Sequence, residues 1–171
     1  MTLRPSREHP GASLDPTGDP MKDGVGAAAW ADREDRYDLT VDGRPRIQPL
    51  SELPEYHLEH RDPDPRGMTV EAGDGEEVGT VTDVWVDLAE PQARYLTVEL
   101  NAGGTVLLPM GFVRVKRSGT VKVRAIFGHH FPDVPKLRVP NRITLLEEDK
   151  IVAYYAGGYR YAEPSRNDSI I

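Results

Sequence analysis

Alternating apolar and polar residues in two neighbouring stretches, residues 80–88 and 94–100, constrain the fold of this chain most strongly. Successive side chains of a β-strand point to opposite sides, so each stretch predicts a strand with one apolar and one polar face. The residues expected on the apolar face are Val84, Val86, Leu88, Leu96, Val98 and Leu100. The residues expected on the opposite face are Asp83, Trp85, Asp87, Tyr95, Thr97 and Glu99; Trp85 is expected to pack, and the others are expected to be solvated.

Turn residues and further short apolar runs extend this pair into a sheet. Asp74-Gly75 and Ser118-Gly119 are typical of hairpin turns, and residues 101–104 supply another turn before the next apolar run. About five or six short antiparallel strands at this spacing favour a small barrel, because closure removes unpaired strand edges. We therefore predict a mainly β domain with an antiparallel barrel.

Residues 1–44 predict an extended arm, because Pro and Gly recur at close intervals and no regular apolar period is sustained. Such a segment buries too little apolar area to order itself, so the domain surface or a partner is expected to hold it. Met21 and Trp30 are its expected anchors.

One helix is expected towards the C-terminus. Thr144 and Glu147 form a Thr-x-x-Glu capping box, in which both side chains bond free backbone donors at the start of the helix. Gly157-Gly158 is expected to end this helix, whose stripe would cover an opening of the barrel. The stripe consists of Leu145, Val152 and Tyr155. The chain thus divides into an arm (1–44), a barrel (45–140), a capping helix (141–158) and a tail (159–171).

Charge and composition exclude several classes of protein. With 28 acidic and 21 basic residues the net charge is −7, so the basic footprint of a nucleic-acid binder is absent. The lack of cysteine excludes a disulfide framework, a thiolate metal site and a cysteine nucleophile. No apolar run approaches the roughly 20 residues that span a bilayer.

Acidic residues gather around the predicted turn between the two strands. Asp83, Asp87 and Glu90, together with Arg94, could supply a general acid–base pair for a hydrolase. Neither a nucleophile motif nor a set of metal ligands accompanies them. Their spacing alone therefore favours the solvated face of a strand followed by a polar turn.

Two pairs of histidines raise the question of a metal site. His57 and His60 have the spacing of a helical metal-binding pair, and His129-His130 adds two imidazoles. These residues lie in loop or proline-flanked sequence rather than on rigid elements. The sequence therefore favours surface histidines, and no metal is expected.

Much of the chain resembles a known family. It is similar to the cytoplasmic part of the H subunit of the purple-bacterial photosynthetic reaction centre in the stretches "TGDPMKDGVGAAAW", "DPDPRGM", "VGTVTDVWVDLAEPQARYLTVEL", "VLLPM" and "VPNRITLLEEDKIVAYYAGGYRYAEP". The resemblance implies a PRC-type barrel with a capping helix and an arm that lies on partner subunits. It also implies a non-catalytic subunit that covers the cytoplasmic face of the L and M subunits, stabilises the complex, shields the secondary quinone and assists proton delivery to it.

The resemblance implies roles for four residues. Glu90 matches an acid that lies near the secondary quinone and supports proton transfer, Asp87 matches a neighbouring acid, and Arg94 matches an arginine of the same cluster. Asp42 matches an acid near the surface entry of the proton route. Some relatives follow that acid with His-Gly-His, whereas residues 43–46 here read Gly-Arg-Pro-Arg, which leaves proton entry open between Asp42 and another surface acid or histidine.

The same resemblance implies the location and partners of the chain. Bacteriochlorophyll, bacteriopheophytin, quinones and iron are expected in the partner subunits, and no cofactor is expected on this chain. H subunits of the family begin with a transmembrane helix, and none is recognisable here. Either that helix has been cut away or another polypeptide supplies it. We therefore expect peripheral attachment to the cytoplasmic face of the photosynthetic inner membrane, through L, M and any separate transmembrane anchor, with light-harvesting subunits as further partners. The alternative is a stand-alone PRC-barrel module that binds another protein.

Overall fold

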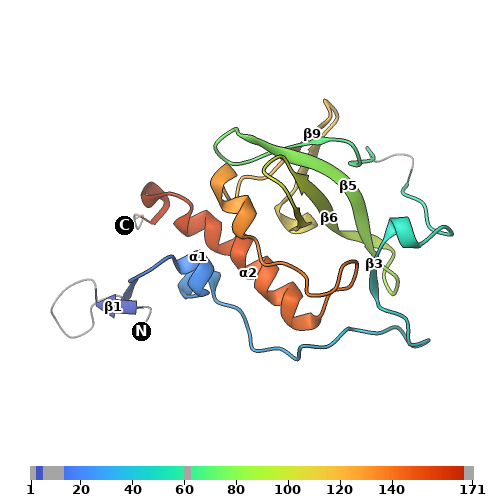
Figure 1. Cartoon of the computed structure of the whole chain (residues 1–171), viewed down its shortest axis with the longest axis horizontal. Helices are drawn as coiled ribbons and strands as arrows, with labels where there is room; N and C mark the ends of the chain where they lie inside the picture. Colours follow the sequence, from blue (N-terminus) through green and yellow to red (C-terminus); the bar gives the residue numbers. More distant parts are fainter. Residues whose placement is uncertain (1–2, 6–13, 60–62, 168–171) are drawn as a thin grey trace.

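The computed structural model describes residues 3–5, 14–59 and 63–167, which form a mainly β chain with a C-terminal helix, as predicted (Figure 1). The strands are β1 (Leu3–Pro5), β2 (Leu14–Pro16), β3 (Ile47–Pro49), β4 (Thr69–Glu71), β5 (Glu77–Asp87), β6 (Gln92–Leu100), β7 (Thr105–Pro109), β8 (Arg114–Lys116) and β9 (Thr120–Lys122). The α-helices are α1 (Pro20–Asp23) and α2 (Leu145–Tyr161). The 3₁₀ helices are η1 (Gly26–Ala28), η2 (Leu50–Glu52), η3 (Met110–Phe112), η4 (Gly128–Asp133) and η5 (Pro164–Asn167).

Within the described residues the main sheet has seven strands in the order β7-β6-β5-β4-β9-β8, with β3 paired to β5. The three predicted turns are confirmed: they join β4 to β5, β6 to β7 and β8 to β9. One pair departs from the antiparallel pattern, since β4 and β9 run parallel with Val70 opposite Val121. Turn signals between sequence neighbours carry no information about such a distant pairing.

The predicted apolar face forms the core of the sheet. Val84 pairs with Leu96 and Leu96 with Leu108, and none of the three side chains is exposed. A second buried row consists of Val81, Val98 and Val106. Burying an aliphatic side chain of this size contributes roughly 1.5–3 kcal/mol, so these two rows account for much of the stability of the sheet.

The opposite face, predicted to be solvated, is covered as well. Trp85, Tyr95 and Asp87 are exposed by only 1%, 2% and 0%. Trp85 lines a cavity of about 320 Å³ with residues from the segment 135–141, and Tyr95 is bonded to Glu148 of α2. The expected packing of Trp85 is confirmed. The prediction was wrong for Asp87 and Tyr95, because alternation shows that two faces differ but not what packs on the second face.

Helix α2 begins as predicted and ends later than predicted. The backbone N–H of Glu147 donates to Oγ1 of Thr144 at 3.1 Å, and the N–H of Thr144 donates to Oε1 of Glu147 at 3.0 Å. This confirms the capping box. Gly157-Gly158 does not end the helix, which continues to Tyr161.

The two glycines allow α2 to pack closely on two sides. A Cβ atom at Gly157 would lie 2.5 Å from Cβ of Ala28 in the arm, and one at Gly158 would lie 2.3 Å from the carbonyl oxygen of Ala125. The helix is therefore pressed between the arm and the segment that follows β9. Val152 was predicted to lie on the buried stripe but is exposed. The prediction failed because α2 buries surfaces against two different segments rather than along a single stripe.

The arm runs along α2 towards β3 (Figure 1). Met21 is buried, as predicted for an anchor, whereas Trp30 is 39% exposed and lies under Nζ of Lys150, 5.4 Å from its ring centroid. The N–H of Leu145 donates to the carbonyl oxygen of Arg36 at 2.9 Å. The part of the arm from residue 20 to residue 36 is thus held by the chain's own helix. The predicted boundaries between the four parts stay a prediction.

Replacing Gly157 by alanine is expected to lower the free energy of unfolding by about 1–3 kcal/mol, because the new methyl group overlaps Ala28. Urea denaturation of the full chain measures this change. Gly111→Ala is the matched control, since nothing lies within 4 Å of its Cβ position. Equal stability of the two variants would contradict the tight packing of α2 on the arm.

Candidate functional site

The carboxylate of Asp87, the last residue of β5, is fully buried between two arginines. Nε of Arg46 donates to its two oxygens at 3.0 and 3.1 Å, and Nη2 of Arg46 lies 3.0 Å from Oδ2. Nη1 of Arg94 donates to Oδ2 at 3.3 Å. These partners are required, because an unpaired buried charge loses several kcal/mol of hydration.

The same carboxylate shapes the turn between β5 and β6. Oδ1 of Asp87 accepts the backbone N–H groups of Ala89 at 2.9 Å and of Glu90 at 3.2 Å. A side chain that accepts from the residues two and three positions later fixes the backbone of a turn. The prediction that Asp87 belongs to a solvated face is therefore wrong, and its carboxylate instead sets the position of Glu90.

Asp87 is held in its ionised form. Burial alone raises the pKa of Asp87, but the hydrogen bonds from Arg46, Ala89 and Glu90 and the charge of Arg46 lower it more. The pKa of Asp87 consequently lies below its ordinary value. Near neutral pH this residue is a fixed negative charge.

Arg46 connects this turn to a second one, formed by residues 38–46. Its N–H donates to the carbonyl oxygen of Asp38 at 2.9 Å, and its Nη1 lies 3.6 Å from Oδ2 of that residue. Its carbonyl oxygen accepts the N–H of Leu88 at 2.8 Å. One arginine thus bonds both turns through its backbone and its side chain.

The structure brings three of the four predicted site residues together. Glu90 is exposed on the turn after β5, Asp87 is buried beneath it, and Arg94 is partly buried beside them. Asp42 is exposed on the neighbouring turn of residues 38–46. Two exposed acids therefore lie on two turns that are joined by one buried ion pair.

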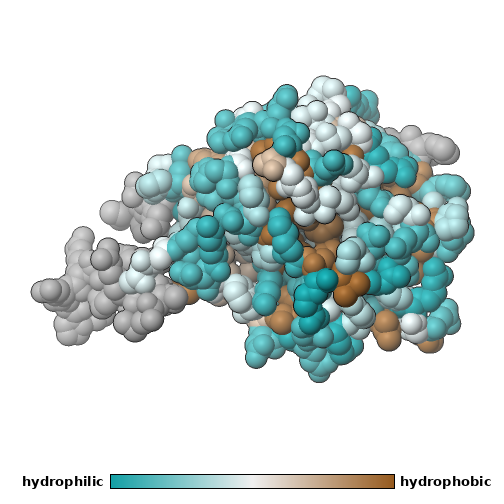
Figure 2. Space-filling view, viewed as in Figure 1, coloured by the Kyte–Doolittle hydropathy of each residue, from teal (hydrophilic) through white to brown (hydrophobic). Residues whose placement is uncertain are grey.

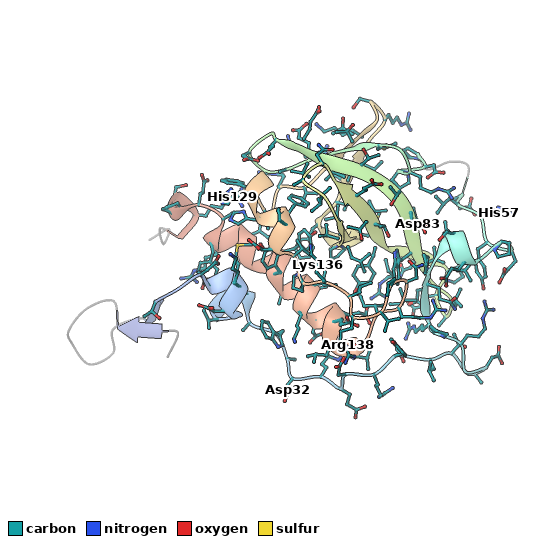
Figure 3. All side chains as sticks on the ribbon, viewed as in Figure 1. Asp32, His57, Asp83, His129, Lys136 and Arg138 are labelled. Atoms are coloured by element: carbon teal, nitrogen blue, oxygen red, sulfur yellow. The ribbon has the colours of Figure 1, made fainter. Side chains whose placement is uncertain are left out.

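Asp83, labelled in Figure 3, does not join this cluster. Its Oδ1 accepts the N–H of Ser51 in η2 at 3.3 Å and that of Val84 at 2.9 Å. The residue is partly buried rather than simply solvated, because η2 packs against β5 at this position. Asp83 therefore has a structural role here.

Sequence reasoning missed a second buried acidic group, close to the first. The hydroxyl of Tyr95 donates to Oε1 of Glu148 at 2.7 Å, which joins β6 to the first turn of α2. The only signal in the sequence was an aromatic residue among polar ones on the second face of a strand. That signal shows that Tyr95 is buried but does not identify its partner.

Two family models match this chain. The photosynthetic reaction centre H-chain N-terminal region matches residues 1–52, and the PRC-barrel domain matches residues 57–128. The two matches together support the identification of the chain as a reaction centre H chain with a PRC-barrel domain. It is therefore a non-catalytic accessory subunit of a membrane-associated complex, and β4 to β9 lie within its PRC-barrel domain. Across the described ranges, no helix of this H chain has the length and apolar character needed to cross a membrane.

The described histidines lie in two places: His57 stands apart from His129 and His130, whose ring centroids are 3.9 Å from each other. His57 and His129 are exposed and lie on opposite sides of the molecule in Figure 3, and His60 lies outside the described residues. Nδ1 of His130 accepts the N–H of Phe127 at 3.0 Å. In the part of the chain that the structure covers, no three His, Cys, Asp or Glu side chains are grouped so that they could hold a metal ion.

Asp87→Asn is expected to lower the free energy of unfolding at pH 7 by about 2–3 kcal/mol, because two arginines lose their shared anion. The folded-state pKa of Asp87 is depressed, so its contribution is present above the ordinary value of about 3.9 and is lost as the pH falls through the folded-state pKa. The difference from wild type should therefore shrink below roughly pH 4.

Urea denaturation from roughly pH 3 to pH 7 tests this dependence. The exposed Asp42→Asn is the matched control, and its effect should stay within about 0.5 kcal/mol at every pH. A difference for Asp87→Asn that does not change with pH would show that its carboxylate is not the stabilising group.

Proposed function

We propose that this H chain covers the cytoplasmic face of the L and M subunits, stabilises their complex, shields the secondary quinone site and assists proton delivery to it. The observation that carries this proposal is the position of Glu90, exposed on a turn whose backbone is fixed by buried Asp87. A functional carboxylate is best placed by a rigid support of this kind. The H-chain match favours this role over that of a stand-alone binding module.

Glu90 is the proposed proton carrier of the turn. A carboxylate can accept a proton from water and pass it to a neighbouring group, and burial against a partner subunit would remove water from around it. Arg94, which binds Asp87, is the proposed positive charge near the quinone site. Asp87 acts through its fixed charge and its hold on the turn, and Asp42 is the proposed point of proton entry.

Exposed apolar side chains on the neighbouring turn support contact with a partner at this end of the molecule. Val41 is fully exposed and Leu39 is 51% exposed, and both flank the tip of the turn that carries Asp42. On the face shown in Figure 2, hydrophobic areas are small and separated by hydrophilic ones. Covering these two exposed aliphatic side chains with a partner surface would stabilise the complex, because it removes apolar area from water.

The cofactors of the complex are assigned to the partner subunits. Bacteriochlorophyll, bacteriopheophytin, quinones and iron are proposed to be held by L and M, and none by this H chain. Membrane attachment is proposed to run through L and M at the cytoplasmic face. A separate transmembrane polypeptide and light-harvesting subunits are further proposed partners.

An affinity-tagged form of this H chain is expected to copurify with bacteriochlorophyll-containing L and M subunits from detergent-solubilised membranes. Absorption spectra and mass spectrometry of the eluate measure this association. Arg46→Gln should reduce the yield, because it removes the ion pairs that its side chain makes with Asp87 and Asp38, while the backbone bonds between the two turns remain. Recovery of the tagged chain without L and M would overturn the proposed partnership.

Glu90→Gln is expected to slow the proton-coupled second reduction of the secondary quinone by about tenfold, because the variant side chain cannot carry a proton. The first electron transfer should be unchanged. Flash-induced absorption kinetics of assembled complexes over roughly pH 6–9 measure both steps. Glu99→Gln, an exposed position further along β6, is the matched control. Unchanged second-reduction kinetics would remove Glu90 from the route.

A further inference from the structure

Tyr95 and Glu148 form an acidic pair that the proposed role of Glu90 does not use. Tyr95 is 2% exposed on β6, and its hydroxyl donates to Oε1 of Glu148 at 2.7 Å. Glu148 lies in the first turn of α2 and is partly buried. Its neighbour Glu147 is taken up by the capping box, so Glu148 is not needed to begin the helix.

Charged groups from three elements surround this pair. Arg94 comes from β6, Arg33 and Asp38 come from the arm, and Asp149 comes from α2 itself. Arg33 pairs with Asp149 at 3.3 Å. Glu148 therefore lies within an organised charge cluster rather than in an apolar pocket.

The cluster is continuous with the ion pair of Asp87. Arg94, which acts on Glu148, lies 3.3 Å from Oδ2 of Asp87. Asp38, which also acts on Glu148, lies 3.6 Å from Arg46, and Arg46 binds Asp87. Arg94 and Asp38 thus lie between the turn that presents Glu90 and the Tyr95–Glu148 pair, and they interact with both.

The two carboxyl groups of this cluster differ in their protonation. Burial raises the pKa of Glu148 above its ordinary value, and the hydrogen bond from Tyr95 and the charges of Arg94 and Arg33 offset only part of that rise. The pKa of Asp87 is shifted in the opposite direction. Where the pKa values of two neighbouring carboxyl groups are shifted in opposite directions, one group serves as a fixed anion and the other can hold a proton.

Tyr95 bonds Glu148 from the side of β6. Burial and the nearby charge of Glu148 raise the pKa of Tyr95, so its hydroxyl keeps its proton. A hydroxyl group both donates and accepts hydrogen bonds, so it can stay bonded to the glutamate in either protonation state.

We propose that Glu148, bonded to Tyr95, is a proton-storing group behind the Glu90 turn. Its carboxylate takes one proton from solvent on the side of the arm, becomes a neutral acid, and returns to the anion when that proton is released towards the turn. No electron moves and no other bond is broken. The inference rests on the proposed function, and it adds a residue of α2 to the supply of protons.

The full chain alone tests the storage step. Infrared spectra recorded over roughly pH 4–8 should contain a protonated carboxyl band that titrates above the ordinary range and is lost in Glu148→Gln. Tyr95→Phe should move this transition to higher pH, because the tyrosine bond favours the anion. Glu99→Gln, which alters an exposed glutamate of β6, should leave it unchanged. A transition that persists in Glu148→Gln overturns the proposal.

Assembled complexes test the supply step. Glu148→Gln should slow the second reduction of the secondary quinone and the accompanying proton uptake by about threefold or more, whereas Glu148→Asp should restore part of the rate because it keeps a carboxyl group. If Glu90→Gln slows the reaction and Glu148→Gln does not, the storage role is wrong and the proposed function stands. If neither variant slows the second reduction, the storage role of Glu148 and the proposed proton transfer through Glu90 are both wrong.

A purely structural role for Glu148 predicts a different pattern. Complexes would then form in lower yield, but those that form would show wild-type kinetics and an unchanged pH profile. If the Glu148→Gln chain does not assemble into the complex, the Tyr95→Phe variant tests the storage role instead, because it keeps the carboxyl group of Glu148. An upward shift in the pH dependence of the second reduction supports storage, and an unchanged dependence overturns it.

Discussion

The burial of one carboxylate, that of Asp87, is the constraint on which this end of the molecule depends. Its hydrogen bonds reach Arg46, Arg94 and two backbone N–H groups, so one side chain fixes a turn, a strand and the end of the arm. Removing a single partner would weaken the compensation of a carboxylate that the folded chain covers completely. The group therefore gives these segments one relative arrangement, which the proposed route of protons through Glu90 needs.

The molecule stabilises its sheet from two sides. Aliphatic side chains of β5, β6 and β7 fill one face, and α2 with the segment 135–141 covers the other. The arm then packs on the outside of α2, where Gly157 lies against Ala28. Because α2 contacts both the arm and the sheet, a change at the charged surface of the helix can reach β6 directly through Tyr95 and Glu148.

Local features of this chain could be predicted from its sequence, and contacts between distant segments could not. The capping box of Thr144 and Glu147 and the glycine turns follow from the chemistry of a few adjacent residues. The burial of Asp87 depends on Arg46, which is 41 positions away in the sequence, and no local sequence pattern predicts their ion pair. Likewise Gly157-Gly158 is read locally as a helix end, whereas its neighbours in space make it a packing surface. Family resemblance singled out Glu90 and Asp42, but the bond that links their turns emerged only from the fold.

The hydroxyl of Tyr155 donates to the carbonyl oxygen of Leu107 at 2.8 Å. Leu107 belongs to β7, the outermost strand on that side of the sheet as far as the structure describes it. An edge carbonyl that is already engaged is a poor template for an incoming strand, and Pro109 removes a donor from the same edge. Addition of a strand from another chain is therefore disfavoured at the β7 edge. Turns and helix surfaces are then the natural points of attachment, and the same protection of the edge disfavours self-association of the chain before it joins its complex.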